Sequence, residues 1–130
     1  MILEVVTPGG SALSQEVDEV TAPGAHGEFG VLAGHTPFLS ALRAGVLRFR
    51  SSGQAKAWAI GPGYVEVSGA DKVVILTRAS QKGEEVDKAA VKKELDEADA
   101  AGKLAADPTA RATAEDRRAW AQARLDAASS

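Results

Sequence analysis

The chain has 130 residues, 45% of them hydrophobic, and its 18 acidic and 15 basic side chains give a net charge of −3. This length suits one domain with an appendage, and the charge provides neither the basic stripe of a nucleic-acid-binding protein nor a polybasic patch for anionic lipid. The chain contains no cysteine, which excludes a disulfide framework and thiol chemistry and is typical of a reducing compartment. We find no signal-peptide pattern and no run approaching roughly 18 apolar residues, so we expect any association with a membrane to pass through a partner.

Residues 1 to 85 have the pattern of short strands separated by turns. Turn residues recur at intervals of roughly 8 to 12 positions, which is typical of a β-sandwich or a barrel, and periodicity does not decide between the two. Leu47 and Phe49 alternate with arginines, whereas residues 72 to 77 do not alternate, which predicts a strand covered on both sides. The predicted strands cover residues 2–6, 17–21, 38–42, 47–50, 55–60, 64–67 and 72–79. The predicted core contains Leu3, Val5, Val20, Leu47, Phe49, Trp58, Ile60, Val65, Val67, Val74 and Leu76.

A glycine-rich stretch from Gly27 to Pro37 stands out because it mixes apolar and acidic side chains with three glycines. We interpret it as a loop that forms a contact surface. It lacks the Gly-Lys-Ser/Thr of a phosphate-binding loop and the long helix of a dinucleotide motif. His35 has only His26 as a second histidine in the chain, so we predict no metal site and interpret His35 as a hydrogen-bonded loop residue rather than a catalytic base.

The composition changes after residue 85, since alanine makes up 15 of the 45 residues from 86 to 130 against 11 of the first 85. We predict a helix that is capped by Asp87, runs to about residue 101 and ends at Gly102. A break at Asp107-Pro108 follows, because the residue before a proline avoids the helical region. Thr113 then caps a second predicted helix, which runs to about Ala127. The two helices form an αα-hairpin, so the predicted domains are residues 1–85 and 86–130.

The predicted contact faces of this hairpin carry few large apolar side chains. An alanine in place of a leucine forgoes roughly 2 kcal/mol of burial, at about 0.8 kcal/mol per CH₂ group, while it favours the helix itself. This combination is compatible with a hairpin that detaches without unfolding and equally with one that stays on the sandwich. The expected contact residues are Val91, Leu95 and Ala98 on the first helix, and Trp120, Ala123 and Ala127 on the second.

Two segments carry a resemblance to a known family. Val20-Thr21-Ala22-Pro23 and the stretch Gly-Glu-Phe-Gly-Val-Leu-x-Gly-His-Thr-Pro from Gly27 to Pro37 closely resemble the signature of the epsilon subunit of F-type ATP synthases. Gly61-x-Gly-Tyr-Val-Glu-Val is similar to that family's Gly-Gly-Phe-Val-Glu-Val segment. Ala33 and Pro62 depart from it, since many members have proline and glycine there. The resemblance implies an α+β fold: an antiparallel β-sandwich of about ten strands in two sheets, followed by an antiparallel αα-hairpin.

The resemblance also implies a function without catalysis or a cofactor. The chain would be a central-stalk (rotor) subunit that links the gamma subunit to the c-ring and couples proton translocation to ATP synthesis. We expect at least one of Phe29 and Val31 to point into the sandwich. The resemblance implies that the matching positions form the interface with the c-ring and gamma. These positions are Glu28, Phe29, Gly30, Val31, Leu32, Gly34 and His35.

The hairpin has a second role in the family, which is inhibition of ATP hydrolysis. The resemblance implies that an extended hairpin reaches the catalytic alpha and beta subunits and that Arg117, Arg118 and Arg124 meet acidic residues of beta. Some members bind ATP on the folded hairpin through an Ile/Leu-Asp-x-x-Arg-Ala segment. Asp87 is present at the matching positions, but Ala90 replaces the arginine that would pair with phosphate, so we predict no tight ATP binding.

Other classes of function remain open at this point. One is a free-standing regulatory β-sandwich that senses a nucleotide, for which ligand binding by the isolated chain is the test. Another is a small enzyme that uses His35 and Glu28, which a His35→Ala variant without turnover would support. We expect a peripheral location on the cytoplasmic face of a bacterial plasma membrane, although an organelle-encoded copy or a processed import product would have the same sequence features.

Overall fold

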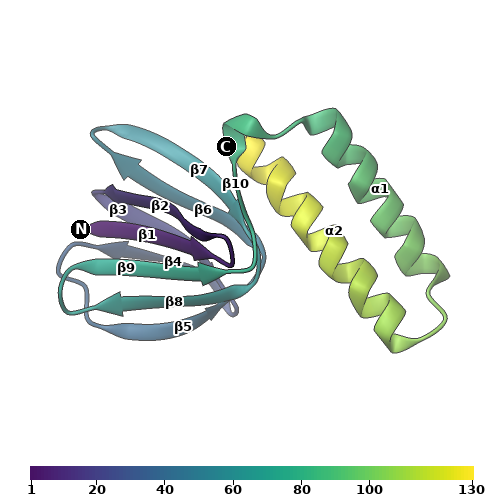
Figure 1. Cartoon of the computed structure of the whole chain (residues 1–130), viewed down its shortest axis with the longest axis horizontal. Coiled ribbons are helices and arrows are strands. Elements are labelled where there is room, and N and C mark those ends of the chain that lie inside the picture. Colours follow the sequence, from purple (N-terminus) through teal and green to yellow (C-terminus); the bar gives the residue numbers. More distant parts are fainter.

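The computed structural model describes all 130 residues, which form ten strands followed by two long helices (Figure 1). The order of elements confirms the predicted α+β class, with a sandwich first and a helical hairpin second. Three of the strands, β2 (Gly10–Glu16), β4 (Gly27–Leu32) and β10 (Ser80–Lys82), were not predicted from the turn and alternation pattern. The elements are β1 (Ile2–Thr7), β2 (Gly10–Glu16), β3 (Glu19–Gly24), β4 (Gly27–Leu32), β5 (Phe38–Leu42), β6 (Gly45–Ser51), β7 (Gln54–Ile60), β8 (Gly63–Ser68), β9 (Lys72–Thr77), β10 (Ser80–Lys82), the 3₁₀ turn η1 (Gly83–Glu85), α1 (Lys88–Leu104) and α2 (Pro108–Ala128).

The strands form two layers. The hydrogen-bonded order is β10-β7-β6-β3-β5-β8-β9-β1-β2, with β4 paired to β3. β3 and β5 share only the pair Gly24–Leu42, so the path folds there into a first layer (β10, β7, β6, β3, β4) and a second layer (β5, β8, β9, β1, β2). All pairs are antiparallel except β1 with β9, which corrects the purely antiparallel expectation. These two strands are far apart in sequence, so no tight hairpin imposes an antiparallel direction on them.

The core lies between the two layers and consists of 16 buried residues. Nine of the eleven predicted core residues belong to it, and the exceptions are Val74 and Leu76. In β9 it is Val73 and Ile75 that are fully buried, while Leu76 is 51% exposed. The strand therefore alternates as an ordinary sandwich strand does, and the prediction that it is covered on both sides is wrong.

The predicted beginning of the first helix and the predicted end of the second near Ala127 are confirmed, and the other two helix boundaries are wrong. The Asp87 carboxylate accepts a hydrogen bond from the backbone N–H of Ala90, as a helix N-cap does. Gly102, however, lies inside α1, which continues to Leu104. Asp107 caps α2 by accepting a hydrogen bond from the Ala110 N–H, because Pro108 suits the first helical position and requires the extended conformation that Asp107 adopts.

The cap of α2 is open to a direct test. Asp107→Ala is expected to lower the stability of the hairpin by about 1 kcal/mol, because the first turn of α2 loses its side-chain acceptor. Thr113, the cap expected from the sequence, lies within α2 and donates its hydroxyl to the Thr109 carbonyl oxygen. Thr113→Ala is the matched control and should change little or stabilise the helix. Thermal unfolding followed by helical circular dichroism measures both, and a larger loss for Thr113→Ala would contradict the structure.

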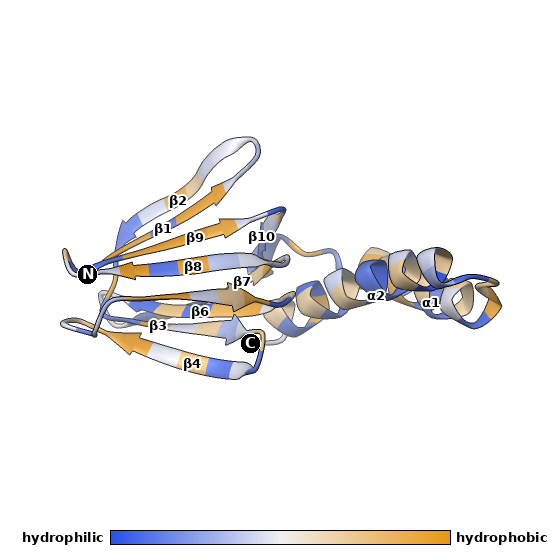
Figure 2. Ribbon diagram, turned by 90° about the horizontal axis from the view of Figure 1, so that it is seen from below, coloured by the Kyte–Doolittle hydropathy of each residue, from blue (hydrophilic) through white to orange (hydrophobic).

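The hairpin joins the sandwich through α2 alone. Ala123 and Ala127 of α2 pack against Val46 and Ala59 of the first layer, and Trp120 covers the margin of this cluster. α1 packs on the far side of α2 (Figure 1), and Figure 2 shows the hairpin projecting from one end of the sandwich. The buried contacts between the helices are made by Val91, Leu95 and Ala121. The hairpin thus docks through small side chains, as the sequence predicted.

Candidate functional site

The stretch that the sequence singled out as a loop begins as a regular strand. Gly27–Leu32 forms β4, which pairs with β3 alone and is an edge strand. Phe29 and Val31 point inward, Val31 with only 1% of its surface exposed, whereas Glu28, Gly30 and Leu32 point outward. The mixture of apolar and acidic residues in this stretch is therefore the alternation of an edge strand with one buried face.

The strand separates the expected interface residues into two places. Glu28 lies near the tight turn that joins β3 to β4, and its Oε2 is 3.2 Å from an Nη atom of Arg48 on β6. Leu32 lies at the other end of β4, roughly 13 Å away at about 3.3 Å per residue. Leu32, Gly34 and His35 share the end of the sandwich that is far from the helices. Glu28 is not brought together with them.

His35 is held by its own loop. Its backbone N–H donates to the Leu32 carbonyl oxygen at 3.1 Å, and its Nδ1 lies 2.7 Å from the Thr36 carbonyl oxygen. The ring lies against Phe38 with centroids 5.2 Å apart, and Phe38 meets Phe29 edge-to-face. No carboxylate contacts the imidazole, and no group of three histidine or acidic side chains in the chain is arranged to hold a metal ion. These contacts suit a structural loop histidine.

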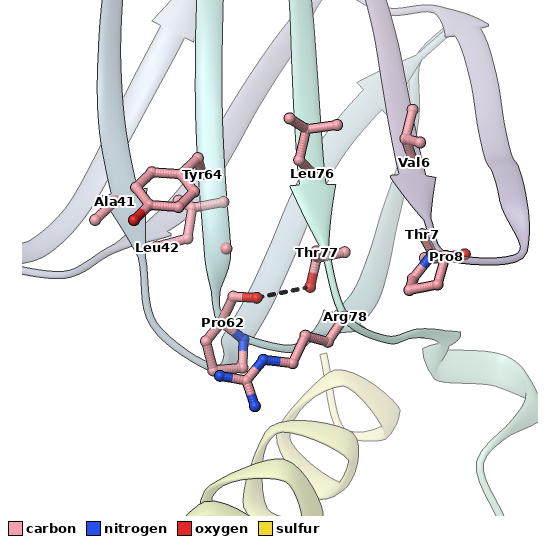
Figure 3. A pocket seen from close by; sticks show the side chains of 11 residues that line it. Val6, Thr7, Pro8, Ala41, Leu42, Pro62, Tyr64, Leu76, Thr77 and Arg78 are labelled. Atoms are coloured by element: carbon pink, nitrogen blue, oxygen red, sulfur yellow. Dashed lines mark hydrogen bonds between the residues drawn. The ribbon is translucent and has the colours of Figure 1, made fainter.

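A second surface, which the sequence reasoning missed, lies on the outward side of the second layer. Leu39, Tyr64 and Leu76 are 69%, 58% and 51% exposed. Tyr64 lies opposite both Ala41 and Leu76, and Leu76 lies opposite Val6, so the apolar side chains continue across β5, β8, β9 and β1. Figure 3 shows Ala41, Tyr64, Leu76 and Val6 around an open groove of about 560 Å³, and Leu39 lies outside this groove on the outward side of β5. We call Val6, Leu39, Ala41, Tyr64 and Leu76 the outer apolar face.

One signal for the outer apolar face was present in the sequence. Val65 and Val67 were assigned to the core, and alternation then places Tyr64 and Glu66 outside. The sequence of β9 does not show which of its alternate residues face the core, because all four residues of its apolar run suit a buried position. Arg78 closes one end of the groove, with its guanidinium directed toward α2 in Figure 3.

The arginines of α2 differ in their surroundings. Arg118 forms an ion pair with Asp99 of α1, with 2.6 Å between Nε and Oδ1, and Arg124 pairs with Glu94 of α1. Arg124 also stacks over the Trp120 ring at 5.2 Å, and its buried Nε has no hydrogen-bond partner. Arg117 is exposed and has no acidic partner. In the folded hairpin, two of the three arginines are therefore occupied by acids of the neighbouring helix.

Neither helix of the structure is long and apolar enough to cross a membrane.

Comparison with protein families matches residues 1–83 to the family described as ATP synthase, Delta/Epsilon chain, beta-sandwich domain. The ATP synthase epsilon chain of Geotalea uraniireducens is 48% identical over 85 residues, which cover 65% of this chain and 61% of the relative. That of Geobacter sulfurreducens is 46% identical over 99 residues, covering 76% and 71%. The matched segment thus spans only about three fifths of the length of the first of these curated relatives.

The fold is also found in solved structures. A chain of the Euglena gracilis mitochondrial ATP synthase, in a structure of OSCP, F1 and the c-ring, superposes with a TM-score of 0.86 at 30% identity. The superposition covers 100% of this chain and 81% of that one. A chain from the central stalk and c-ring of the Tetrahymena thermophila mitochondrial enzyme superposes with a TM-score of 0.63 at 14% identity, covering 98% and 95%, and supports the fold alone.

Proposed function

The chain belongs to the delta/epsilon chain family of ATP synthases, and we propose that it is a non-catalytic rotor subunit that links gamma to the c-ring. In this role it transmits rotation between proton translocation and ATP synthesis. The observation that carries the proposal is the family match over almost the whole sandwich, which is the part that would bind the rotor. The curated relatives described above come from bacteria, which supports a peripheral location on the cytoplasmic face of a bacterial plasma membrane, held by these partners.

The outer apolar face is the surface we assign to gamma. Contiguous exposed apolar side chains on a protein of this size mark a site of protein–protein contact. Tyr64 lies near its centre, and aromatic anchors of this kind are common hot spots. Glycine at position 63 allows close packing beneath it, since a side-chain carbon there would lie 1.8 Å from the Leu76 carbonyl oxygen. The face is therefore apolar, and the strands beneath it approach closely at Gly63.

The β4 edge and the loop that follows it are the surface we assign to the c-ring. Leu32, Gly34 and His35 are exposed at one end of the sandwich and are available to a partner. Glu28 and Gly30 lie on the outward side of the same strand. Phe29 and Val31 support this edge from inside, because their side chains pack in or against the core.

We also propose a division of labour between residues 1–85 and 86–130. The main core is made by side chains from the strands and the segments between them, so the sandwich has a core of its own. The hairpin is proposed to brake ATP hydrolysis by carrying Arg117, Arg118 and Arg124 to acidic residues of beta. Because Arg118 and Arg124 are paired with acids of α1 in the folded hairpin, this contact requires both ion pairs to break.

Nucleotide binding is a separate prediction. Asp87 uses its carboxylate to cap α1, and Ala90 offers no cation for a phosphate group. Millimolar ATP is therefore expected to leave the melting temperature of the chain unchanged. An Ala90→Arg variant under the same conditions is the control that restores the missing cation. A shift of several degrees for the natural sequence would support the nucleotide-sensing alternative instead.

The proposed function can be tested in the assembled enzyme. Purified chain is added to membrane vesicles whose ATP synthase lacks this subunit, and proton pumping per ATP hydrolysed is measured. We expect the chain to restore coupling and Glu28→Lys to restore less, because the lysine breaks the pair with Arg48 and reverses the charge at the β4 edge. Glu97→Lys, on the exposed side of α1, is the matched control. No restoration by any of the chains would contradict the proposed function.

A further inference from the structure

Two segments that are distant in the sequence form one surface at the end of the sandwich far from the helices. The loop from Leu32 to Pro37 joins β4 to β5, and the turn from Ser68 to Asp71 joins β8 to β9 (Figure 1). The backbone N–H of Gly34 donates to Oδ1 of Asp71 at 3.1 Å, across a separation of 37 residues. Pro37 packs close to Gly69, where a side-chain carbon would lie 3.6 Å from the proline ring.

The bond between Gly34 and Asp71 is the one hydrogen bond that ties residues 33–37 to another part of the sandwich. The residues from Leu32 to Pro37 are all exposed, so burial does little to hold their backbone. Both partners have positive φ angles, +79° for Gly34 and +60° for Asp71. A non-glycine residue is uncommon in this conformation, and aspartate and asparagine are the residues best able to adopt it.

The Asp71 carboxylate has one further contact. Its Oδ2 lies 3.6 Å from the α-amino group of Met1. That group is paired more closely with Glu16 at 2.8 Å, and the hydrogen bond that it donates to the Glu16 carboxylate is the main cause that raises its pKa. The amino group therefore keeps a partner if Asp71 is replaced.

We propose that Asp71 is a positioning residue that holds the β4–β5 loop ready for the c-ring, and that the β8–β9 turn forms the second half of this docking surface. The inference rests on the proposed function. The surface presents the exposed side chain of Leu32, and the exposed carboxylate of Glu16 lies at the same end of the sandwich, paired with the Met1 amino group that Asp71 also approaches. It therefore fits a c-ring loop that carries a basic side chain next to an apolar one.

A loop that becomes ordered only on binding loses backbone conformational entropy at that step, which weakens the affinity. A loop that is already ordered therefore binds more tightly. The Asp71 bond orders part of a five-residue segment in advance. Its loss is expected to weaken binding to a gamma–c-ring assembly by about tenfold, while binding to gamma alone, through the outer apolar face, stays unchanged.

Two variants separate positioning from direct contact. Asp71→Gly removes the acceptor and accepts a positive φ without strain, whereas Asp71→Asn keeps an acceptor oxygen and loses the charge. We expect about tenfold weaker binding and fast hydrogen exchange at the Gly34 amide for Asp71→Gly, with both properties near those of the natural chain for Asp71→Asn. Unchanged affinity of Asp71→Gly despite fast exchange at Gly34 would overturn the inference. So would an Asp71→Asn variant that binds as weakly as Asp71→Gly.

Leu32→Glu separates this inference from the function on which it rests. It places a charge on the exposed end of β4 and leaves the Gly34–Asp71 bond in place. Weakened binding by Leu32→Glu with unchanged binding by Asp71→Gly would contradict the inference alone. Unchanged binding by both variants would contradict docking of this end of the sandwich on the c-ring, and with it the proposed role.

Discussion

Gly83→Ala is expected to release the helical hairpin from the sandwich while the sandwich stays folded. Gly83 begins the η1 turn between β10 and α1 and is buried beneath the end of α2. A side-chain carbon at this position would lie 2.4 Å from the carbonyl oxygen of Ala127 and 2.9 Å from that of Ala57. Both atoms belong to the backbone, so no side-chain rotation relieves the clash.

Gly83→Ala is expected to release the hairpin because the apolar contact between α2 and the sandwich is small. Overpacking of this kind costs about 1–3 kcal/mol, while the contact it opposes consists mainly of alanines together with Val46 and the margin of Trp120. Movement of α2 therefore relieves the clash at a lower cost than distortion of the strands. Small-angle scattering, or a distance between labels on β7 and α1, should show a more extended molecule.

Gly102→Ala is the matched control for this prediction. Gly102 lies within α1, and a side-chain carbon there meets only the Ala114 methyl group at 3.7 Å, which is an ordinary contact. The variant should keep the compact shape and gain up to about 1 kcal/mol of helix stability. A Gly83→Ala chain as compact as Gly102→Ala would contradict the prediction, because it would show that a side chain fits at residue 83 without displacing α2.

Leu76→Asp is expected to weaken binding to gamma by about a hundredfold. Full burial of a leucine side chain contributes roughly 1.5–3 kcal/mol, and an interface that closes over a carboxylate must also desolvate it. A loss of about 2.7 kcal/mol corresponds to a hundredfold change in the dissociation constant. Because Leu76 points away from the core, the variant should fold normally.

The control for this substitution is another exposed leucine. Leu104 ends α1 at the tip of the hairpin and is 84% exposed. Leu104→Asp makes the same chemical change far from the outer apolar face and should bind gamma as the natural chain does. Binding to purified gamma is measured for both variants by calorimetry, with melting temperatures to confirm folding. Equal affinities would remove the outer apolar face from the gamma interface.

The fold was largely predictable from the sequence, and the errors in that prediction have physical causes. Turn residues and alternation locate seven of the ten strands, and the pattern of alanine locates the hairpin. The phase of β9 is set by its partners, since Ile75 lies opposite Val65 and Val73 opposite Val67. A run of four apolar residues does not by itself show which of them point into the core. Asp107-Pro108 was interpreted only as a break, although an aspartate followed by proline is also a signal for a helix start.

The candidate site was less predictable than the fold. Glu28 and His35 are close in the sequence, and β4 sets them at opposite ends of a strand. The outer apolar face combines residues from four strands, so it depends on pairings that no local pattern contains. The bond between Gly34 and Asp71 joins segments 37 residues apart and has no sequence signature at all.

The central claim is that the sandwich is the module that binds the rotor. The most direct test measures binding to a gamma–c-ring assembly by the whole chain and by a chain ending at Glu85. We predict that both bind with similar affinity, because the proposed docking surfaces lie entirely on the strands and loops before residue 83. Absence of binding by both chains, or binding that requires the hairpin, would contradict this account.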